Sequence, residues 1–227
     1  MNWNIQMIKS LDRISYLTSS LEEAEKTFSA FFGAKPLKKV ISKDRNYESM
    51  LYGFENMHFE IIKKNDDSSE EDKLCGFSLL SDDLTRLNIS TSYDEYENNE
   101  ESDNKTQLIK SIDIKQSPDF QLSVNEYENF DMNPSNENNL FALDHLVLTT
   151  NKSDALINLY EKELGIRLAL DQFVEKWGGR MLFFRTGQAT IEVIDNKVEG
   201  NDQFGVWLGK QKTLEKKENI SSKMVST

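Results

Sequence analysis

Two stretches of this sequence decide its fold, LDRISYLTSSLEEAEKTFSAFFG (Leu11 to Gly33) and LDHLVLTTNKSDALINLYEKELG (Leu143 to Gly165). They align without a gap at an offset of 132 residues, and each begins with Leu-Asp and ends with Gly. At the same offset MHFEII matches ATIEVI, so that Glu60 corresponds to Glu192. Further on, CGFSLL matches FGVWLG less closely. Matches that keep their order and spacing indicate an internal repeat.

Each repeat predicts a strand, a helix and three further strands. ISYLT and LVLTT are short β-branched and apolar runs, which are typical of strands. Ser20 and Glu23 have the spacing of a capping box before a run with helical apolar periodicity, and Gly33 and Gly165 stand where a helix would end. We expect helices near residues 20–32 and 152–164, and strands near 12–18, 37–42, 47–54, 57–63, 143–150, 167–172, 180–186 and 189–195.

Composition excludes several classes of protein. The 227 residues include 27 Lys and Arg against 39 Asp and Glu, a net charge of -12, which argues against nucleic acid and anionic membrane surfaces as partners. No apolar run approaches the roughly 18 residues of a membrane-spanning helix, and the N-terminus lacks a signal-peptide pattern. One cysteine and two histidines exclude an internal disulfide framework and a three-histidine metal site. We therefore expect a cytoplasmic protein.

The repeat also divides the chain. Residues 1–9 are expected to be a lead-in, and 223–227 a tail. Residues 10–92 form a first, diverged module, and 140–222 form a second. Between them, residues 93–139 are predicted to be an acidic connector, because YDEYENNEESDNK has too few apolar residues to order itself. The connector also contains LIKSIDIK and FQLSVNEY, whose alternation would suit two added strands.

A tandem βαβββ repeat with His or Arg on its first strand and Glu on its last resembles the vicinal oxygen chelate superfamily. This superfamily includes glyoxalases, bleomycin-resistance proteins and extradiol dioxygenases. DHLVLTT, LYEKELGIRLALDQ and GGRMLFFRTGQATIEVI carry the resemblance best, and it covers residues 10–92 and 140–222. It implies an α+β fold in which the two modules pair and their curved mixed sheets form one open cup.

The resemblance also implies a metal site in that cup. The family places its ligands on the first and last strands of the modules, which here are Arg13, Glu60, His145 and Glu192. A guanidinium offers only donors, so Arg13 cannot ligate. His145, Glu192 and Glu60 would then bind one divalent ion, Zn, Mn, Fe, Co or Ni. Alternatively, Arg13 forms an ion pair with Glu60 in place of the metal, or binds an anionic oxygen of a substrate.

Four further residues are less certain members of the site. His58 lies two residues before Glu60 on the same strand, so both side chains would face the same side of the sheet. His58 would then either bind the metal or line the cup; the remaining alternative is that it faces solvent. Trp177 and Arg180 flank a Gly-Gly turn that would be either a lip over the substrate or a plain tight turn. Cys75 is expected to be a buried thiol rather than a nucleophile.

The favoured function is that of a metal-dependent lyase or isomerase of the glyoxalase-like group. The metal would stabilise an enolate of a small, oxygen-rich substrate, with Glu60 or Glu192 moving a proton. A first alternative is a metal-free protein that binds or sequesters a small molecule in the same cup; such members are commonly dimers, so a homodimer is open here. A second alternative is an extradiol-type dioxygenase. The sequence has no Ser-His-Asp spacing, phosphate loop or GxGxxG motif.

Overall fold

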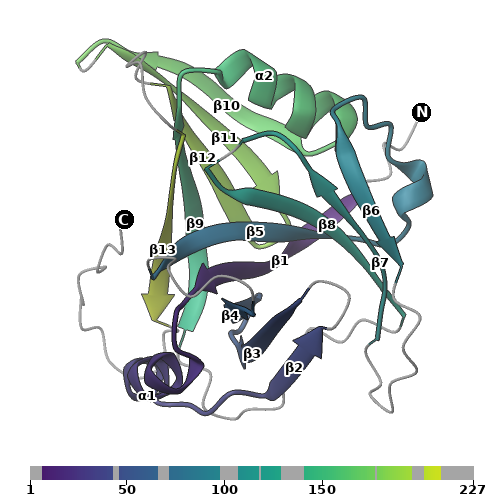
Figure 1. The fold of residues 1–227 in the computed structure, drawn as a ribbon. Coiled ribbons are helices and arrows are strands. Elements are labelled where there is room, and N and C mark those ends of the chain that lie inside the picture. Colours follow the sequence, from purple (N-terminus) through teal and green to yellow (C-terminus); the bar gives the residue numbers. More distant parts are fainter. Residues whose placement is uncertain are drawn as a thin grey trace.

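Two mixed β-sheets, here called sheet A and sheet B, build the molecule in a computed structural model (Figure 1). The structure describes residues 7–42, 46–65, 72–97, 107–117, 119–128, 141–176, 178–195 and 202–210. Sheet A contains β1 (Ile8–Leu17), β2 (Lys38–Ser42), β3 (Tyr47–Gly53), β4 (His58–Lys64), β5 (Lys73–Ser81), β6 (Tyr93–Glu97), β7 (Gln107–Ile114) and β8 (Gln121–Glu128). Sheet B contains β9 (Phe141–Thr150), β10 (Arg167–Val174), β11 (Gly179–Thr186), β12 (Ala189–Asp195) and β13 (Gln203–Lys210).

Sheet A is itself a pair of modules. Its strand order is β2-β3-β4-β1-β5-β8-β7-β6, with β1 parallel to β4, β5 parallel to β8, and β1 antiparallel to β5. The strands β5 to β8 therefore repeat the arrangement of β1 to β4. Helix α1 (Leu21–Phe32) follows β1, but a single 3-10 turn, η1 (Leu84–Arg86), follows β5. The second module of sheet A thus has the same strand arrangement as the first and one helical turn in place of a helix.

Sheet B contains the second sequence repeat. Its order is β10-β11-β12-β9-β13, and β9 is parallel to β12. Helix α2 (Ser153–Ile157) follows β9 and continues as a π-helix, η2 (Asn158–Glu163). Strand β13 pairs with β9 in the antiparallel sense, as β5 does with β1. In Figure 1, α2 lies over sheet B and α1 lies at the opposite end of the molecule.

The expected α+β fold of tandem βαβββ modules with curled mixed sheets is confirmed. The two modules of the sequence repeat, however, lie in different sheets, and β1 to β4 pair instead with β5 to β8. The segment expected as a connector supplies three strands, β6 to β8, to sheet A. It resembles a connector in sequence because β6, YDEYE, is an edge strand with all five residues exposed. The described residues contain no helix long and apolar enough to cross a membrane.

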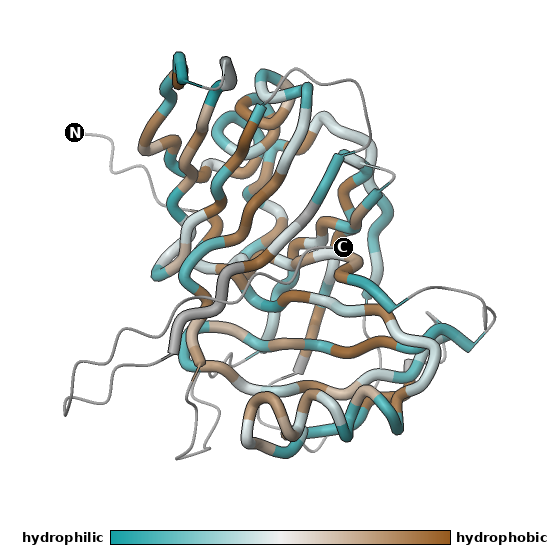
Figure 2. The backbone as a smooth tube through the Cα atoms, turned by 90° about the vertical axis from the view of Figure 1, so that its left-hand side faces the viewer, coloured by the Kyte–Doolittle hydropathy of each residue, from teal (hydrophilic) through white to brown (hydrophobic). Residues whose placement is uncertain are grey.

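Alternation along the strands places one face of each sheet in the core. Figure 2 shows hydrophobic and hydrophilic residues following one another along the strands. In sheet A, Ile14, Ile61, Leu79 and Leu122 are fully buried. Helix α1 covers this face, and its Phe28 packs on Tyr16 and Phe59 with ring centroids 5.0 and 5.1 Å apart. The opposite face of sheet A carries mostly polar side chains, and it curls around the cavity described below.

The two sheets are joined by polar and aromatic contacts. The side chain of Asn56 donates to the Leu143 carbonyl at 2.8 Å and accepts from its amide at 2.9 Å. Phe141, at the start of β9, stacks on Phe31 of α1 with ring centroids 5.7 Å apart. Glu163, in the π-helix, accepts hydrogen bonds from the backbone and hydroxyl groups of Ser90 and Thr91. These contacts fix sheet B against both modules of sheet A.

The pairing of β5 with β8 predicts the effect of Gly76→Ala. An added Cβ would lie 2.4 Å from the Gln121 carbonyl oxygen of β8, so the strands must separate. We expect a loss of about 2 kcal/mol in the free energy of unfolding, measured by urea denaturation. Gly205 holds the corresponding place in β13, and a Cβ there meets nothing within 4 Å. Gly205→Ala is the matched control and should be nearly neutral; equal losses in both variants would contradict the pairing.

Candidate functional site

The concave face of sheet A encloses a cavity of about 890 Å³. Both of its modules line this cavity: Arg13, Ser15 and Glu60 come from the first, and Ser78, Ser123 and Asn125 from the second. Its size lies within the roughly 300 to 1,000 Å³ of small-molecule sites. Cys75 also lines the cavity and is partly buried.

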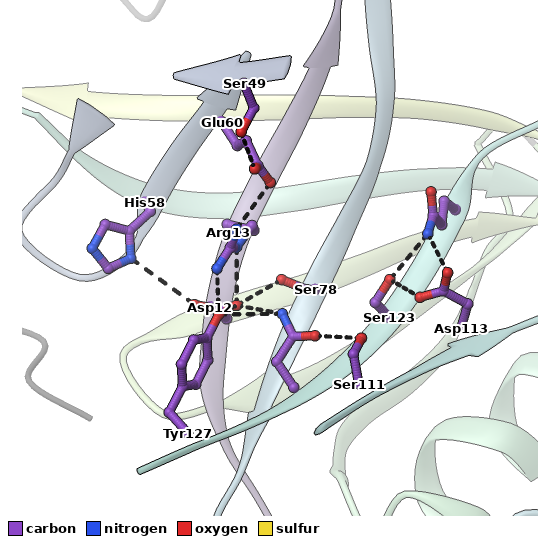
Figure 3. A network of polar contacts seen from close by, with 12 residues as sticks. Asp12, Arg13, Ser49, His58, Glu60, Ser78, Ser111, Asp113, Ser123 and Tyr127 are labelled. Atoms are coloured by element: carbon purple, nitrogen blue, oxygen red, sulfur yellow. Dashed lines mark hydrogen bonds and ion pairs between the residues drawn. The ribbon is translucent and has the colours of Figure 1, made fainter. Parts of the chain in front are cut away.

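Arg13 is the centre of a polar network at this cavity (Figure 3). Its Nε donates to Asp12 Oδ2 at 3.1 Å, its Nη1 donates to Glu60 Oε2 at 3.0 Å, and its Nη2 donates to the Tyr127 hydroxyl. The register of β1 against β5 shifts between Leu11 and Arg13. Such a bulge re-aims side chains, which accounts for the adjacent Asp12 and Arg13 entering one network.

Asp12 is a carboxylate with no exposed surface. Its Oδ2 also accepts from Ser78 at 2.9 Å, Asn125 at 2.7 Å and Tyr127 at 2.7 Å. Burial by itself would raise the pKa of Asp12, but the Arg13 guanidinium and these hydrogen bonds hold that pKa below its usual value. Burial raises the pKa of Tyr127 well above its usual value, which keeps the phenol neutral. Asp12 is therefore charged and Tyr127 donates to it.

Glu60 is 5% exposed, and both of its oxygens are engaged. Oε2 accepts from Arg13, and Oε1 accepts from Ser49 at 2.8 Å. The register of β5 on β8 has the same offset as that of β1 on β4. At the spacing of Arg13 and Glu60, the second module of sheet A therefore offers Leu74 with Gln121, Gly76 with Ser123, or Ser78 with Asn125. None of these pairs contains a His, Cys or carboxylate side chain, so together with Arg13 they do not fit a divalent ion, for which only Glu60 is a strong ligand.

His58 lies beside the network and does not line the cavity. Its Nδ1 is 3.9 Å from Asp12 Oδ1, and neither of these two buried atoms has a hydrogen-bond partner among the described residues. Burial lowers the pKa of His58, although Asp12 opposes that effect. His58 is therefore a neutral neighbour of the network at physiological pH.

His145 and Glu192 lie together in sheet B, apart from Arg13 and Glu60 in sheet A. His145 Nε2 is 3.7 Å from Glu192 Oε2, and His145 Nδ1 is 3.1 Å from Asp144 Oδ2. Burial raises the pKa of Glu192, and His145 opposes the rise. Of the four expected residues, Arg13 and Glu60 line the sheet A cavity, whereas His145 and Glu192 lie in sheet B and do not line it. Among the described residues, no three His, Cys, Asp or Glu side chains form a group that could hold a metal ion.

Arg180, expected near the substrate, makes surface ion pairs in sheet B. Its Nη2 is 2.6 Å from Asp171 and its Nη1 is 2.6 Å from Asp154. These pairs connect β11 with β10 and with the start of α2, and Arg180 does not line the sheet A cavity. Trp177 lies outside the described residues.

The sequence reasoning did not identify Asp12, Tyr127, Asn125 or Asp113 as site residues. Asp12 carried a usable signal, since the repeat begins with Leu-Asp in both copies. The other three lie on β7 and β8, within the segment interpreted as a connector. Recognising that segment as a module would have placed them opposite Arg13.

Comparison with solved structures gives the same fold. A halotolerant catechol dioxygenase, BphC, matches with a TM-score of 0.55 and 11% identity over 88% of this chain and 68% of its own. A mutant of 4-hydroxymandelate synthase from Streptomyces coelicolor matches with a TM-score of 0.52 and 10% identity over 86% and 66%. An extradiol ring-cleaving dioxygenase from B. fuscum matches with a TM-score of 0.51 and 12% identity over 82% and 54%.

These structural neighbours are members of the vicinal oxygen chelate superfamily, and the chain has the fold of that superfamily. No protein-family model and no curated protein matches the sequence. The chain spans between about half and two thirds of the length of these three structures. At this identity the comparison establishes the fold alone.

The buried network predicts a large effect of Arg13→Met. Removing the guanidinium leaves Asp12 and Glu60 without the cation that donates hydrogen bonds to both, so we expect a loss of about 3 kcal/mol in the free energy of unfolding at neutral pH. Because the pKa of Asp12 is lowered in the folded protein, the ionised carboxylate contributes its full stabilisation above about pH 4. That stabilisation is lost as the pH falls through the pKa of Asp12 in the folded state. The deficit of the variant should therefore shrink on acidification, as measured by chemical denaturation at several pH values.

Arg180→Met is the matched control, because it removes an arginine that also holds two carboxylates, but at the surface. Surface ion pairs contribute less than about 1 kcal/mol, so this variant should retain nearly the stability of the wild type. An Arg13→Met protein as stable as Arg180→Met would contradict the role assigned to the network.

Proposed function

We propose that this protein binds a small molecule in the sheet A cavity without a metal ion. The main support for this proposal is the ion pair between Arg13 Nη1 and Glu60 Oε2, which are 3.0 Å apart. The pair lies where the family resemblance implies metal ligands. The pair is anchored further by Asp12, Ser49 and Tyr127. Because Arg13 and Glu60 each have further hydrogen-bond partners, both side chains remain in place when a ligand binds. The floor of the cavity is therefore preorganised.

Metal-dependent lyase or isomerase chemistry, favoured on sequence, becomes the second candidate. It is supported by His145 and Glu192, a nitrogen and a carboxylate donor 3.7 Å apart, with Asp144 placed to orient the imidazole. A divalent ion there would supply Lewis-acid chemistry. A catalytic zinc site uses three protein ligands, and the expected third, Glu60, is engaged by Arg13 in the other sheet. His145 and Glu192 therefore support a metal-dependent reaction less strongly than the sheet A cavity supports small-molecule binding.

The dioxygenase alternative ranks third. Its usual metal set is two histidines and one carboxylate. The sequence has only His58 and His145, and they lie in different sheets. His58 also faces Asp12 at 3.9 Å rather than the cavity.

Blocking the cavity tests the proposed function. Gln121, at the exposed start of β8, lines the cavity, so Gln121→Trp should reduce its volume without disturbing the core. We expect a library of neutral, anionic and cationic fragments, screened by saturation-transfer NMR, to contain binders of the wild type that Gln121→Trp no longer binds.

Gln172→Trp provides the control, since Gln172 is also an exposed strand glutamine but lies on β10 of sheet B. It should bind the same fragments as the wild type. If every fragment that binds the wild type also binds Gln121→Trp equally well, or if no fragment binds, the cavity is not the binding site.

A further inference from the structure

The charges at the floor of the sheet A cavity balance one another. Two buried carboxylates, Asp12 and Glu60, face the guanidinium of Arg13, and Lys38 lies near enough to interact electrostatically with all three groups. His58 adds no positive charge near neutral pH, because burial lowers its pKa. Arg13 is therefore already neutralised by fixed carboxylates, and a charged ligand placed beside it would bring a charge that the floor does not compensate.

The exposed part of the lining carries positive charge. Lys64, Lys73 and Lys115 line the cavity, and all three are exposed. Lys115 is 3.0 Å from Asp94, which offsets part of this charge. A cationic ligand would have to pass these lysines to reach a floor that has no excess of negative charge to bind it. Neither sign of ligand charge is thus matched along the whole cavity, which favours a neutral ligand.

The remaining polar groups of the lining suit hydroxyl groups. Ser15, Ser78 and Ser123 present hydroxyls, and Asn125 and Gln121 present amides. Asp113 accepts from Ser123 at 2.7 Å and from Gln121 at 2.8 Å (Figure 3). A carboxylate has about four acceptor positions, so Asp113 can also accept from a ligand. Hydroxyl groups both donate and accept, so they can satisfy such a mixed lining without bringing charge.

Two tyrosines supply aromatic rings to the lining. Phe77 and Phe120 belong to the core, because Phe77 pairs in register with the buried Leu122 and so faces away from Ser78 and Ser123. Tyr47 on β3 and Tyr96 on β6 line the cavity from strands near opposite edges of the sheet. Aromatic faces pack well on the C–H faces of a saturated ring. The cavity therefore combines rings for an apolar face with carboxylate and amide groups for hydroxyls.

We propose that the ligand of the sheet A cavity is a neutral, hydroxyl-rich molecule, namely a sugar or another polyol. This inference rests on the proposed function, because it names the class of ligand for the same cavity. It is independent of the metal question at His145 and Glu192, which lie in the other sheet.

Probes matched in shape and different in charge test the inference. Glucose, galactose, mannose, maltose and lactose are compared with glucuronate and glucosamine by saturation-transfer NMR on the full chain. At least one neutral sugar should bind at least tenfold more tightly than both charged probes. Its affinity should not change with salt, because no ion pair forms. Binding of glucuronate or glucosamine in preference, or of no neutral sugar at millimolar concentration, would overturn the inference.

Asp113→Asn locates the binding. Removing the charged acceptor should weaken the binding of the neutral sugar about tenfold. Asp94→Asn is the matched control: Asp94 pairs with Asp113 in the register of β6 and β7, but it does not line the cavity. It should bind the sugar as the wild type does, and equal binding by all three proteins would overturn the inference. If fragments bind in a Gln121→Trp-sensitive way but no sugar does, the ligand class is wrong and the proposed function stands.

Discussion

A largely buried positive charge must be balanced within the protein, and the charge of Arg13, whose side chain is 19% exposed, organises sheet A. Its partners come from three strands: Asp12 from β1, Glu60 from β4 and Tyr127 from β8. Ser78 of β5 joins through Asp12. These four strands, β4, β1, β5 and β8, are neighbours at the centre of the sheet. One guanidinium therefore connects the two modules at the point where they meet.

The same balance shapes the chemistry of the cavity. Arg13 occupies one of the positions at which the family resemblance implies a metal ligand, and it pairs with Glu60, the carboxylate expected as a ligand. A fixed cation of this kind cannot exchange ligands or leave, so it supplies structure rather than Lewis acidity. The metal-type pair, His145 and Glu192, is found in sheet B, where the described residues add no third ligand of the expected kind. Structural and potentially catalytic groups are thus divided between the two sheets.

The sequence predicted the modules because their signals are local. The cap at Ser20, the glycine at position 33, which has φ of 67°, and the alternation of the strands all act within a few residues. The partner of the first module was not predictable from the repeat. The module β5 to β8 has one helical turn in place of a helix, and its edge strand is acidic and exposed. Without a helix, that module lacks the helical periodicity by which the first module was recognised.

The candidate site was predicted in part for the same reason. The alternative of an Arg13–Glu60 ion pair needed only two residues of one module, and the structure contains that pair at 3.0 Å. Convergence with His145 and Glu192 needed the correct pairing of modules, which spacing along the chain does not encode. Asp12 and Tyr127 were missed because a bulge and a long-range contact, 115 residues apart in sequence, bring them together.

The claim that Arg13 takes the place of a metal is tested most directly by metal content. The chain would be expressed without an affinity tag in medium supplemented with zinc, manganese, iron, cobalt and nickel, and then analysed by inductively coupled plasma mass spectrometry. The account predicts far less than one equivalent of any of these metals per chain. A stoichiometric metal that is retained through gel filtration and lost in Glu60→Gln would contradict it.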